Sequence, residues 1–133
     1  MKKIPLLLAF LFSFAFANSF GQVPTVTLGN IPANAKKDGK MVPVYTTSDR
    51  IIQAGKLKPG NPSDKIESYL FSVATGSEMW GPFEGKGAQL SDKMISRLKE
   101  TKGPGVLVFF DDIKVKQGGV VKMARPLSFK YDQ

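Results

Sequence analysis

Residues 87–131 read GAQLSDKMISRLKETKGPG (87–105), VLVFFDDIKVK (106–116), QGGVVKMAR (117–125) and PLSFKY (126–131). This segment decides the fold, because its patterns predict one amphipathic helix followed by three closely spaced strands. The remainder of the chain is expected to supply strands that complete the same core. No catalytic constellation is recognisable in it or elsewhere in the sequence.

The helix is predicted at about residues 91–102. Ser91 is a suitable N-cap, and Asp92 places negative charge in the first turn, where the helix dipole favours it. Gly103 and Pro104 end the helix. Its single apolar stripe is formed by Leu90, Met94, Ile95 and Leu98. Because the stripe is narrow, we expect the helix to lie on a sheet.

The apolar run at 106–110 predicts a central strand that is buried on both faces. The following pair, Asp111 and Asp112, has two interpretations. Adjacent carboxylates can contribute to a calcium or magnesium site, but no further acidic residue lies nearby at loop-like spacing. We therefore favour a structural bulge or turn between Phe110 and Ile113.

Two hairpin registers are compatible with Gln117-Gly118-Gly119. A two-residue Gly-Gly turn pairs Val115 with Lys122 and mixes buried with exposed side chains. A three-residue loop pairs Val115 with Val121, Ile113 with Met123 and Lys114 with Lys122, which keeps one face apolar. The second register is the one we predict.

The other strands are predicted by alternation or by composition. In 67–74, Tyr69, Phe71 and Val73 share an inward face, and the last strand points Leu127, Phe129 and Tyr131 inward. Weaker β signals occupy 23–28, 41–46 and 51–52, whereas 33–40, 56–64 and 75–87 are predicted as loops. The fold class is therefore mainly β, a β-sandwich or immunoglobulin-like antiparallel sheet with one helix at about 91–102.

The start of the chain predicts export. Lys2 and Lys3 precede an apolar run at 4–17, which is typical of a signal peptide and too short to span a membrane. Cleavage after Ala17 or after Gly21 fits the small-residue rule. We prefer Gly21, which makes 1–21 the signal and 22–133 a single domain without a membrane span. The product is expected in the periplasm or outside the cell, in a Gram-negative-type envelope.

Composition argues against several classes of catalytic function. The chain has no His and no Cys, so the usual acid–base switch, thiol nucleophile and transition-metal ligands are missing. Ser-Lys or paired-carboxylate mechanisms remain formally possible but have no recognisable motif. We predict no enzymatic activity, no catalytic or metal-binding residue and no cofactor. Loss of Lys2 and Lys3 with the signal leaves 17 basic and 11 acidic side chains, a net charge of +6.

Two candidate partner-binding groups stand out. The predicted hairpin gathers Lys114, Lys116 and Lys122 on one face, either as solvated edge lysines or as a site for an acidic partner. Trp80 and Phe83, in the predicted loop 75–87, form either a ligand platform or a lid over the core. Nucleic acid is not an expected partner, because only three arginines are present and aromatic residues do not alternate with them.

The quoted segments together resemble the C-terminal domain of GldM, the gliding-motility protein of type IX secretion machinery. The matching positions in this sequence are Gly87, Ser91, Gly105, Phe110, Asp111, Asp112, Ile113 and Phe129. The resemblance extends over residues 65–131 and is loose before them. Full-length members carry a membrane-spanning helix and several periplasmic domains, whereas this chain is expected to have a signal peptide and one domain.

That resemblance implies a β-sandwich-like domain with one helix, a protein-binding role and no catalytic residues. We therefore expect a secreted protein-interaction domain whose partners are envelope or secretion-machinery proteins. The alternative function is a small-ligand or glycan-binding module that uses the Trp80 loop.

Overall fold

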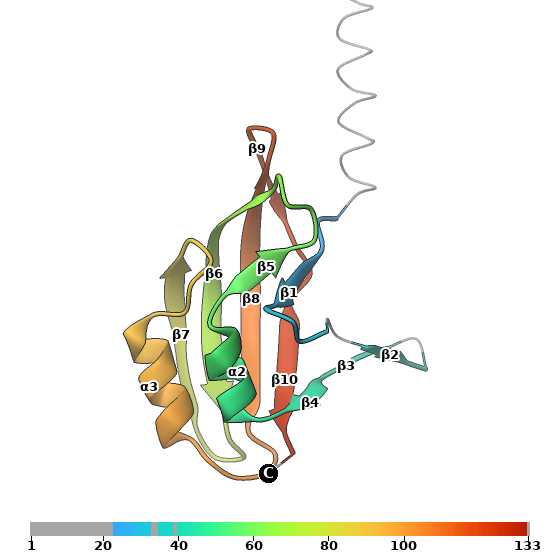
Figure 1. Ribbon diagram of the computed structural model, residues 1–133. Helices are drawn as coiled ribbons and strands as arrows, with labels where there is room; N and C mark the ends of the chain where they lie inside the picture. Colours follow the sequence, from blue (N-terminus) through green and yellow to red (C-terminus); the bar gives the residue numbers. More distant parts are fainter. Residues whose placement is uncertain (1–22, 33–34, 39, 133) are drawn as a thin grey trace, which may run out of the picture.

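The structure is a computed structural model that describes residues 23–32, 35–38 and 40–132 (Figure 1). The predicted signal at 1–21 lies outside these residues. In order, the elements are β1 (Val26–Leu28), β2 (Ala35–Lys37), β3 (Lys40–Val42), β4 (Val44–Thr46), α2 (Ser48–Ala54), β5 (Leu57–Pro59), β6 (Lys65–Ala74), β7 (Met79–Lys86), α3 (Asp92–Glu100), β8 (Leu107–Gln117), β9 (Val120–Met123) and β10 (Leu127–Tyr131). The fold is mainly β, as predicted. Neither described helix is long and apolar enough to cross a membrane.

The main sheet contains six strands in the order β4-β10-β8-β6-β7, with β9 also paired to β8. The long strand β8 is central, because β6 pairs along one side of it while β10 and β9 share the other side. All these pairs are antiparallel except β4 with β10, which is parallel. The predicted antiparallel sheet therefore contains one parallel pair, at this edge.

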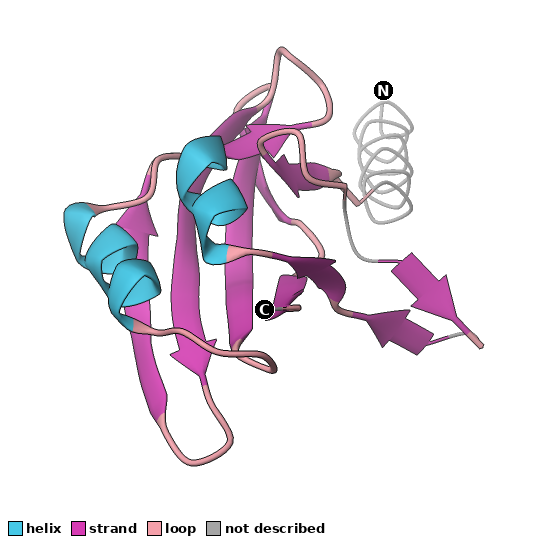
Figure 2. Cartoon of the chain, turned by 60° about the horizontal axis from the view of Figure 1, so that its bottom comes forward, coloured by secondary structure: helices cyan, strands magenta, loops and turns pink. Residues whose placement is uncertain are grey.

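A second layer covers only one face of the main sheet. Helices α2 and α3 and the two-stranded β1–β5 ribbon lie on that face (Figures 1 and 2). The β2–β3 hairpin extends away from this body (Figure 2). No described helix lies on the opposite face, so the sheet is open on that side.

The core lies between the sheet and this covering layer. The ring of Phe110 lies at its centre, with ring centroids 5.4 Å from Phe71, 5.7 Å from Tyr69 and 6.0 Å from Phe129. The helices contribute fully buried Ile51, Met94 and Leu98. The inward residues predicted for β6 and β10 are all buried, which confirms those assignments.

Two bulges keep β8 and β6 in phase. Leu70 pairs with Asp111 and Ser68 pairs with Lys114, so β8 has one extra residue between those pairs. Asp112 takes up the extra length with a left-handed φ of 47°. This confirms the predicted bulge, and it explains how Phe110 and Ile113 both face the core although they are three residues apart.

The second bulge lies in β6 and compensates for the first. Ile66 pairs with Val115 while Ser68 pairs with Lys114, so here β6 has the extra residue. The register beyond this point returns to the register that precedes both bulges. Ile66 and Tyr69, again three apart, are consequently both buried.

The predicted helix is confirmed as α3. The backbone N–H of Met94 donates to the Ser91 hydroxyl at 3.3 Å, which makes Ser91 the N-cap. The helix ends at Thr101, slightly before the predicted stop at Gly103. All four residues of the predicted apolar stripe contribute to the core: Leu90, Met94 and Leu98 are buried in it, and Ile95 packs against it.

A second helix was not predicted. Ile51 and Ile52, expected in a short strand, lie in α2, whose N-cap Thr47 accepts a hydrogen bond from the backbone N–H of Arg50 at 3.3 Å. Gly55 ends this helix with φ of 69°. The start and stop signals outweigh the β propensity of two isoleucines, because the first helical turn is capped.

Three predicted loops contain strands. Segment 33–40 includes β2 and the start of β3, 56–64 includes β5, and 75–87 includes β7. Glycine and proline suggested loops, but Gly85 in β7 is required by the Tyr69 ring that lies against its backbone. Pro43 separates β3 from β4, as its missing N–H would suggest.

The predicted hairpin register is wrong. Val115 pairs with Lys122, Lys114 with Met123 and Gln117 with Val120. Gly118 and Gly119 form a two-residue turn, and both have positive φ, 54° and 92°. That turn suits the twist of a β-hairpin, and it prevails over burial of the β9 side chains because β9 lies at an edge.

The prediction that the 106–110 strand is buried on both faces is also wrong. The β8 residues Leu107 and Phe109 are only half-buried, so the strand is covered on one face and not on both.

Candidate interaction surface

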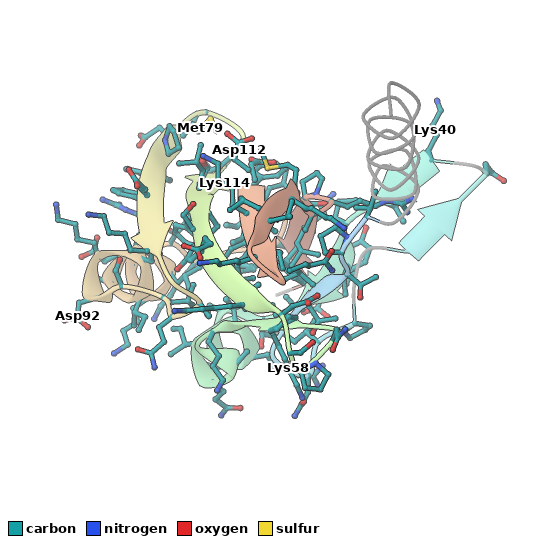
Figure 3. The ribbon with its side chains drawn as sticks, turned by 90° about the horizontal axis from the view of Figure 1, so that it is seen from above. Lys40, Lys58, Met79, Asp92, Asp112 and Lys114 are labelled. Carbon is teal, nitrogen blue, oxygen red and sulfur yellow. The ribbon has the colours of Figure 1, made fainter. Side chains whose placement is uncertain are left out.

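The open side of the main sheet, which we call the outer face, is built from cross-strand rows of side chains. One row runs Met79, Ala74, Leu107, Lys130 and Tyr45 across β7, β6, β8, β10 and β4. Figure 3 shows Met79, Asp112 and Lys114 on this side, and Lys58 on the side of the helices. The outer face is the largest part of the described sheet without a covering layer.

The middle of the outer face is apolar. Leu70, Leu107 and Phe109 are half-buried on neighbouring strands although no helix covers them. At the two sides of the sheet, Tyr45 and Met79 are 63% and 62% exposed. Contiguous apolar side chains on a surface are typical of a protein-binding site.

The end of the outer face next to the hairpin is basic. Lys65 pairs directly with Lys116, while Lys86 and Lys114 lie on either side of Ser68 in the next row. All four lysines, which we call the lysine quartet, are exposed. None of them forms a salt bridge within the described part of the chain, where Arg97 and Glu100 form the ion pair, at 3.5 Å.

The quartet differs from the lysine face that the sequence predicted. Lys114 and Lys116 lie together as expected, but Lys122 pairs with Val115 and therefore faces the other side of the sheet. Lys65 and Lys86 were missed. Alternation from Tyr69 would have placed Lys65 on the inner face, because the β6 bulge has no local signal, and nothing in the Gly- and Pro-rich β7 sequence predicts a strand that holds Lys86.

Asp111 and Asp112 are exposed beside the quartet. Burial, followed by the charge of Asp112, raises the pKa of Asp111 above its ordinary value. Across residues 23–32, 35–38 and 40–132, no group of three or more acidic side chains could hold a metal ion. The pair's observed role is the β8 bulge.

Trp80 and Phe83 lie on β7, on the same side as the helices, and not in a loop. Trp80 pairs with Val73, and the guanidinium carbon of Arg97 lies 4.6 Å from the centroid of the Trp80 ring. Phe83 pairs with Phe71, with ring centroids 6.3 Å apart. Both aromatic side chains are half-buried against the core. They correspond to the predicted lid more closely than to an open platform.

A hollow of about 550 Å³ opens between α2 and β4. Its polar lining includes Arg50 and Gln53, which are exposed, and Asn30. The hydroxyl of Thr46, a residue that also lines the hollow, is buried without a hydrogen-bond partner among the described residues. These groups do not converge as a nucleophile and base would, so the hollow has no evident chemistry.

The outer face is thus an apolar and basic surface. A comparison of the sequence with protein-family models finds no matching family, and a comparison with curated proteins finds no match.

Proposed function

We propose that this chain is a non-enzymatic protein-interaction domain and that the outer face binds its partner. One observation supports this proposal above all: an uncovered sheet face presents half-buried apolar side chains next to four lysines without ion pairs. Burial of Leu107 and Phe109 by a partner would remove apolar surface from water. The lysine quartet would favour an acidic rim on that partner.

The proposed place of action is the periplasm or the cell surface. This rests on the predicted signal peptide at 1–21. The proposed association with type IX secretion or gliding machinery rests on the resemblance of residues 65–131 to the C-terminal domain of GldM. Envelope and secretion-machinery proteins are accordingly the first partners to test.

A capture experiment tests the outer face. Immobilised domain (22–133) is incubated with envelope extract, and the retained proteins are identified and then re-tested in purified form. Reversing Lys65, Lys114 and Lys116 to Glu should abolish retention. Reversing Lys58, Lys93 and Lys102 changes the net charge equally, on exposed positions away from the quartet, and should leave retention intact. Equal retention by both triple variants would refute the proposal.

The alternative of a glycan-binding module has less support. A sugar-stacking tryptophan needs an accessible ring face, and Arg97 occupies one face of Trp80. Half-burial of Phe83 against Phe71 leaves it little free ring surface as well.

A further inference from the structure

The main sheet has a stepped edge at β9. Along one side of β8, β10 pairs with residues 107–110 and β9 with residues 114–117. Strand β10 pairs with β4 on its other side, but β9 has no second neighbour within the described residues. Figure 1 shows the β8–β9 hairpin projecting beyond the rest of the sheet. The sheet is therefore one strand narrower at β9 than at β10.

The backbone of β9 can pair with an additional strand at this free edge. Val120 and Lys122 pair with Gln117 and Val115, and the N–H of Ala124 donates to the carbonyl of Ile113 at 2.8 Å. These are the alternate residues of β9 that bond to β8. In an antiparallel ladder the residues between them direct their N–H and C=O groups away. Val121 and Met123 therefore present two donors and two acceptors at the free edge.

The side chains of β9 are unusual for a free edge. Val120, Val121 and Met123 are 55%, 53% and 51% exposed. Natural edge strands commonly carry charges that prevent pairing with another chain, and β9 has only Lys122. Val121 and Met123 lie on the outer face, and Lys122 lies on the opposite face. An added strand would thus meet an apolar surface on one side and a cation on the other.

Charge decides between a second copy of this chain and a different partner. Two copies of β9 could pair antiparallel with Val121 opposite Met123 of the other copy, which joins their apolar side chains. That same register places Lys122 opposite Lys122, and like charges directly opposite destabilise a strand pair. The chain also has a formal net charge of +8, or +6 without the predicted signal. Self-pairing is therefore disfavoured.

We propose that β9 binds an extended segment of a partner protein by antiparallel strand addition. The segment alternates apolar side chains, opposite Val121 and Met123, with acidic side chains, opposite Lys122. This inference rests on the proposed protein-binding function and names the chemistry of the partner. The quartet lysines Lys114 and Lys116 lie about 10 Å from the added strand, two strand spacings away, and favour acidic residues beside it.

Synthetic peptides test this directly. The probe is a fluorescein-labelled peptide of about nine residues in which valine alternates with glutamate, followed by fluorescence anisotropy. Methylating its valine amides blocks the hydrogen bonds to β9 and should abolish binding. Methylating its glutamate amides modifies only the far edge and should preserve binding. Equal effects of the two methylated peptides would overturn the proposal.

Two protein variants test the same contact from the other side. Lys122→Glu should bind the valine–glutamate peptide about tenfold more weakly and gain affinity for a valine–lysine peptide. Lys58→Glu, with the same charge change on the helix side, should behave as the parent chain does. Val121→Pro removes one outward N–H and should abolish binding, with thermal unfolding confirming that it folds. If Lys58→Glu weakens binding as much as Lys122→Glu, general electrostatics accounts for the effect and the proposal fails.

The outcomes separate this inference from the proposed function. If no peptide binds while the quartet variant still loses its envelope partner, strand addition is wrong and the outer face remains the binding surface. Vesicles of phosphatidylglycerol and phosphatidylcholine are the remaining arm. Binding to the anionic vesicles that is lost in Val121→Ser, without peptide binding, would assign β9 to a membrane surface and overturn the proposal.

Discussion

The ring of Tyr69 lies against the backbone of Gly85 on the neighbouring strand, where a Cβ would overlap the ring atoms. The Tyr69 hydroxyl donates to the carbonyl of Gln89 at 2.6 Å, which joins β6 to the segment before α3. Gly85→Ala should therefore destabilise the fold by about 2 kcal/mol, through overpacking of a buried site. Urea unfolding would measure this effect.

Gly76 is the matched control for that substitution. Nothing lies within 4 Å of a Cβ built at Gly76, and its φ is not in the left-handed region. Gly76→Ala should change the free energy of unfolding by no more than about 0.5 kcal/mol. Equal effects at the two glycines would contradict the proposed role of the Tyr69 ring.

Tyr69 and Tyr131 should make the fold sensitive to alkali. Burial raises the pKa of each from 10.0 to about 12, with the charge of Asp49 contributing at Tyr131. Because the folded-state pKa exceeds the unfolded one, stability is complete below about pH 10 and declines as the pH rises toward about 12. Urea midpoints across this range should fall in the parent chain and fall less in either Tyr→Phe variant.

The same two tyrosines should differ at neutral pH. Tyr69→Phe removes a hydrogen bond and should destabilise the fold by about 1 kcal/mol. The Tyr131 hydroxyl is buried without a hydrogen-bond partner among the described residues, so Tyr131→Phe should be neutral or stabilising. A larger loss at Tyr131 would mean that its hydroxyl has a partner in solution.

Asp112 should tolerate glycine better than a β-branched residue. Its φ of 47° lies in the left-handed region, which glycine adopts freely and valine does not. Asp112→Gly should preserve the melting temperature, and Asp112→Val should destabilise the fold by about 2 kcal/mol. Lys114→Val, at an exposed position nearby whose φ is not in the left-handed region, should have an effect below about 0.5 kcal/mol. Equal behaviour of the two valine variants would argue against the bulge.

Lys65 and Lys116 should repel each other measurably. They are directly opposite on β6 and β8, and both are exposed. Lys65→Glu should stabilise the fold by about 0.5 kcal/mol at low salt, and the gain should shrink as salt screens the pair. In a Lys116→Gln background the same substitution should give a smaller gain. A gain that is independent of both salt and Lys116 would rule out the pair as its source.

Trp80 fluorescence should separate the two proposed binding functions. The parent chain should show no response to a panel of glycans, because Arg97 covers one face of the indole. Arg97→Ala should shift the emission to longer wavelength, because water gains access to that face. A saturable response of the parent chain to any glycan would support the alternative function instead.

Much of the framework could be predicted from periodicity. The helix α3, the inward residues of β6 and β10, and the bulge at Asp112 all follow from local patterns that the tertiary structure reinforces. The β9 register could not be predicted from burial, because it depends on turn geometry at Gly118-Gly119 and leaves Val121 and Met123 exposed. That prediction assumed that apolar residues face the core, and a free edge does not require this.

The missed elements share another cause. In strand β7, Gly85 leaves room for the Tyr69 ring of the neighbouring strand, and a contact between residues distant in sequence has no local signal. The predicted lysine face was incomplete for the same reason, since Lys86 joins Lys114 only through the pairing of β7 with β6. The sequence prediction placed Lys122 on the wrong face of the sheet, because a one-residue shift in the hairpin register moves a side chain to the opposite face.

The two bulges in β6 and β8 have an evolutionary consequence. Deleting Asp112 alone would remove the bulge from β8, and Ile113 and Val115 would stay on the inner face by ordinary alternation, but the bulge in β6 would lose its counterpart. Deleting one residue near Glu67 at the same time would remove the β6 bulge as well and leave two regular strands in register. Insertions and deletions in these strands are therefore expected to occur together in related domains, so that the lengths of the two strands are inherited as a pair.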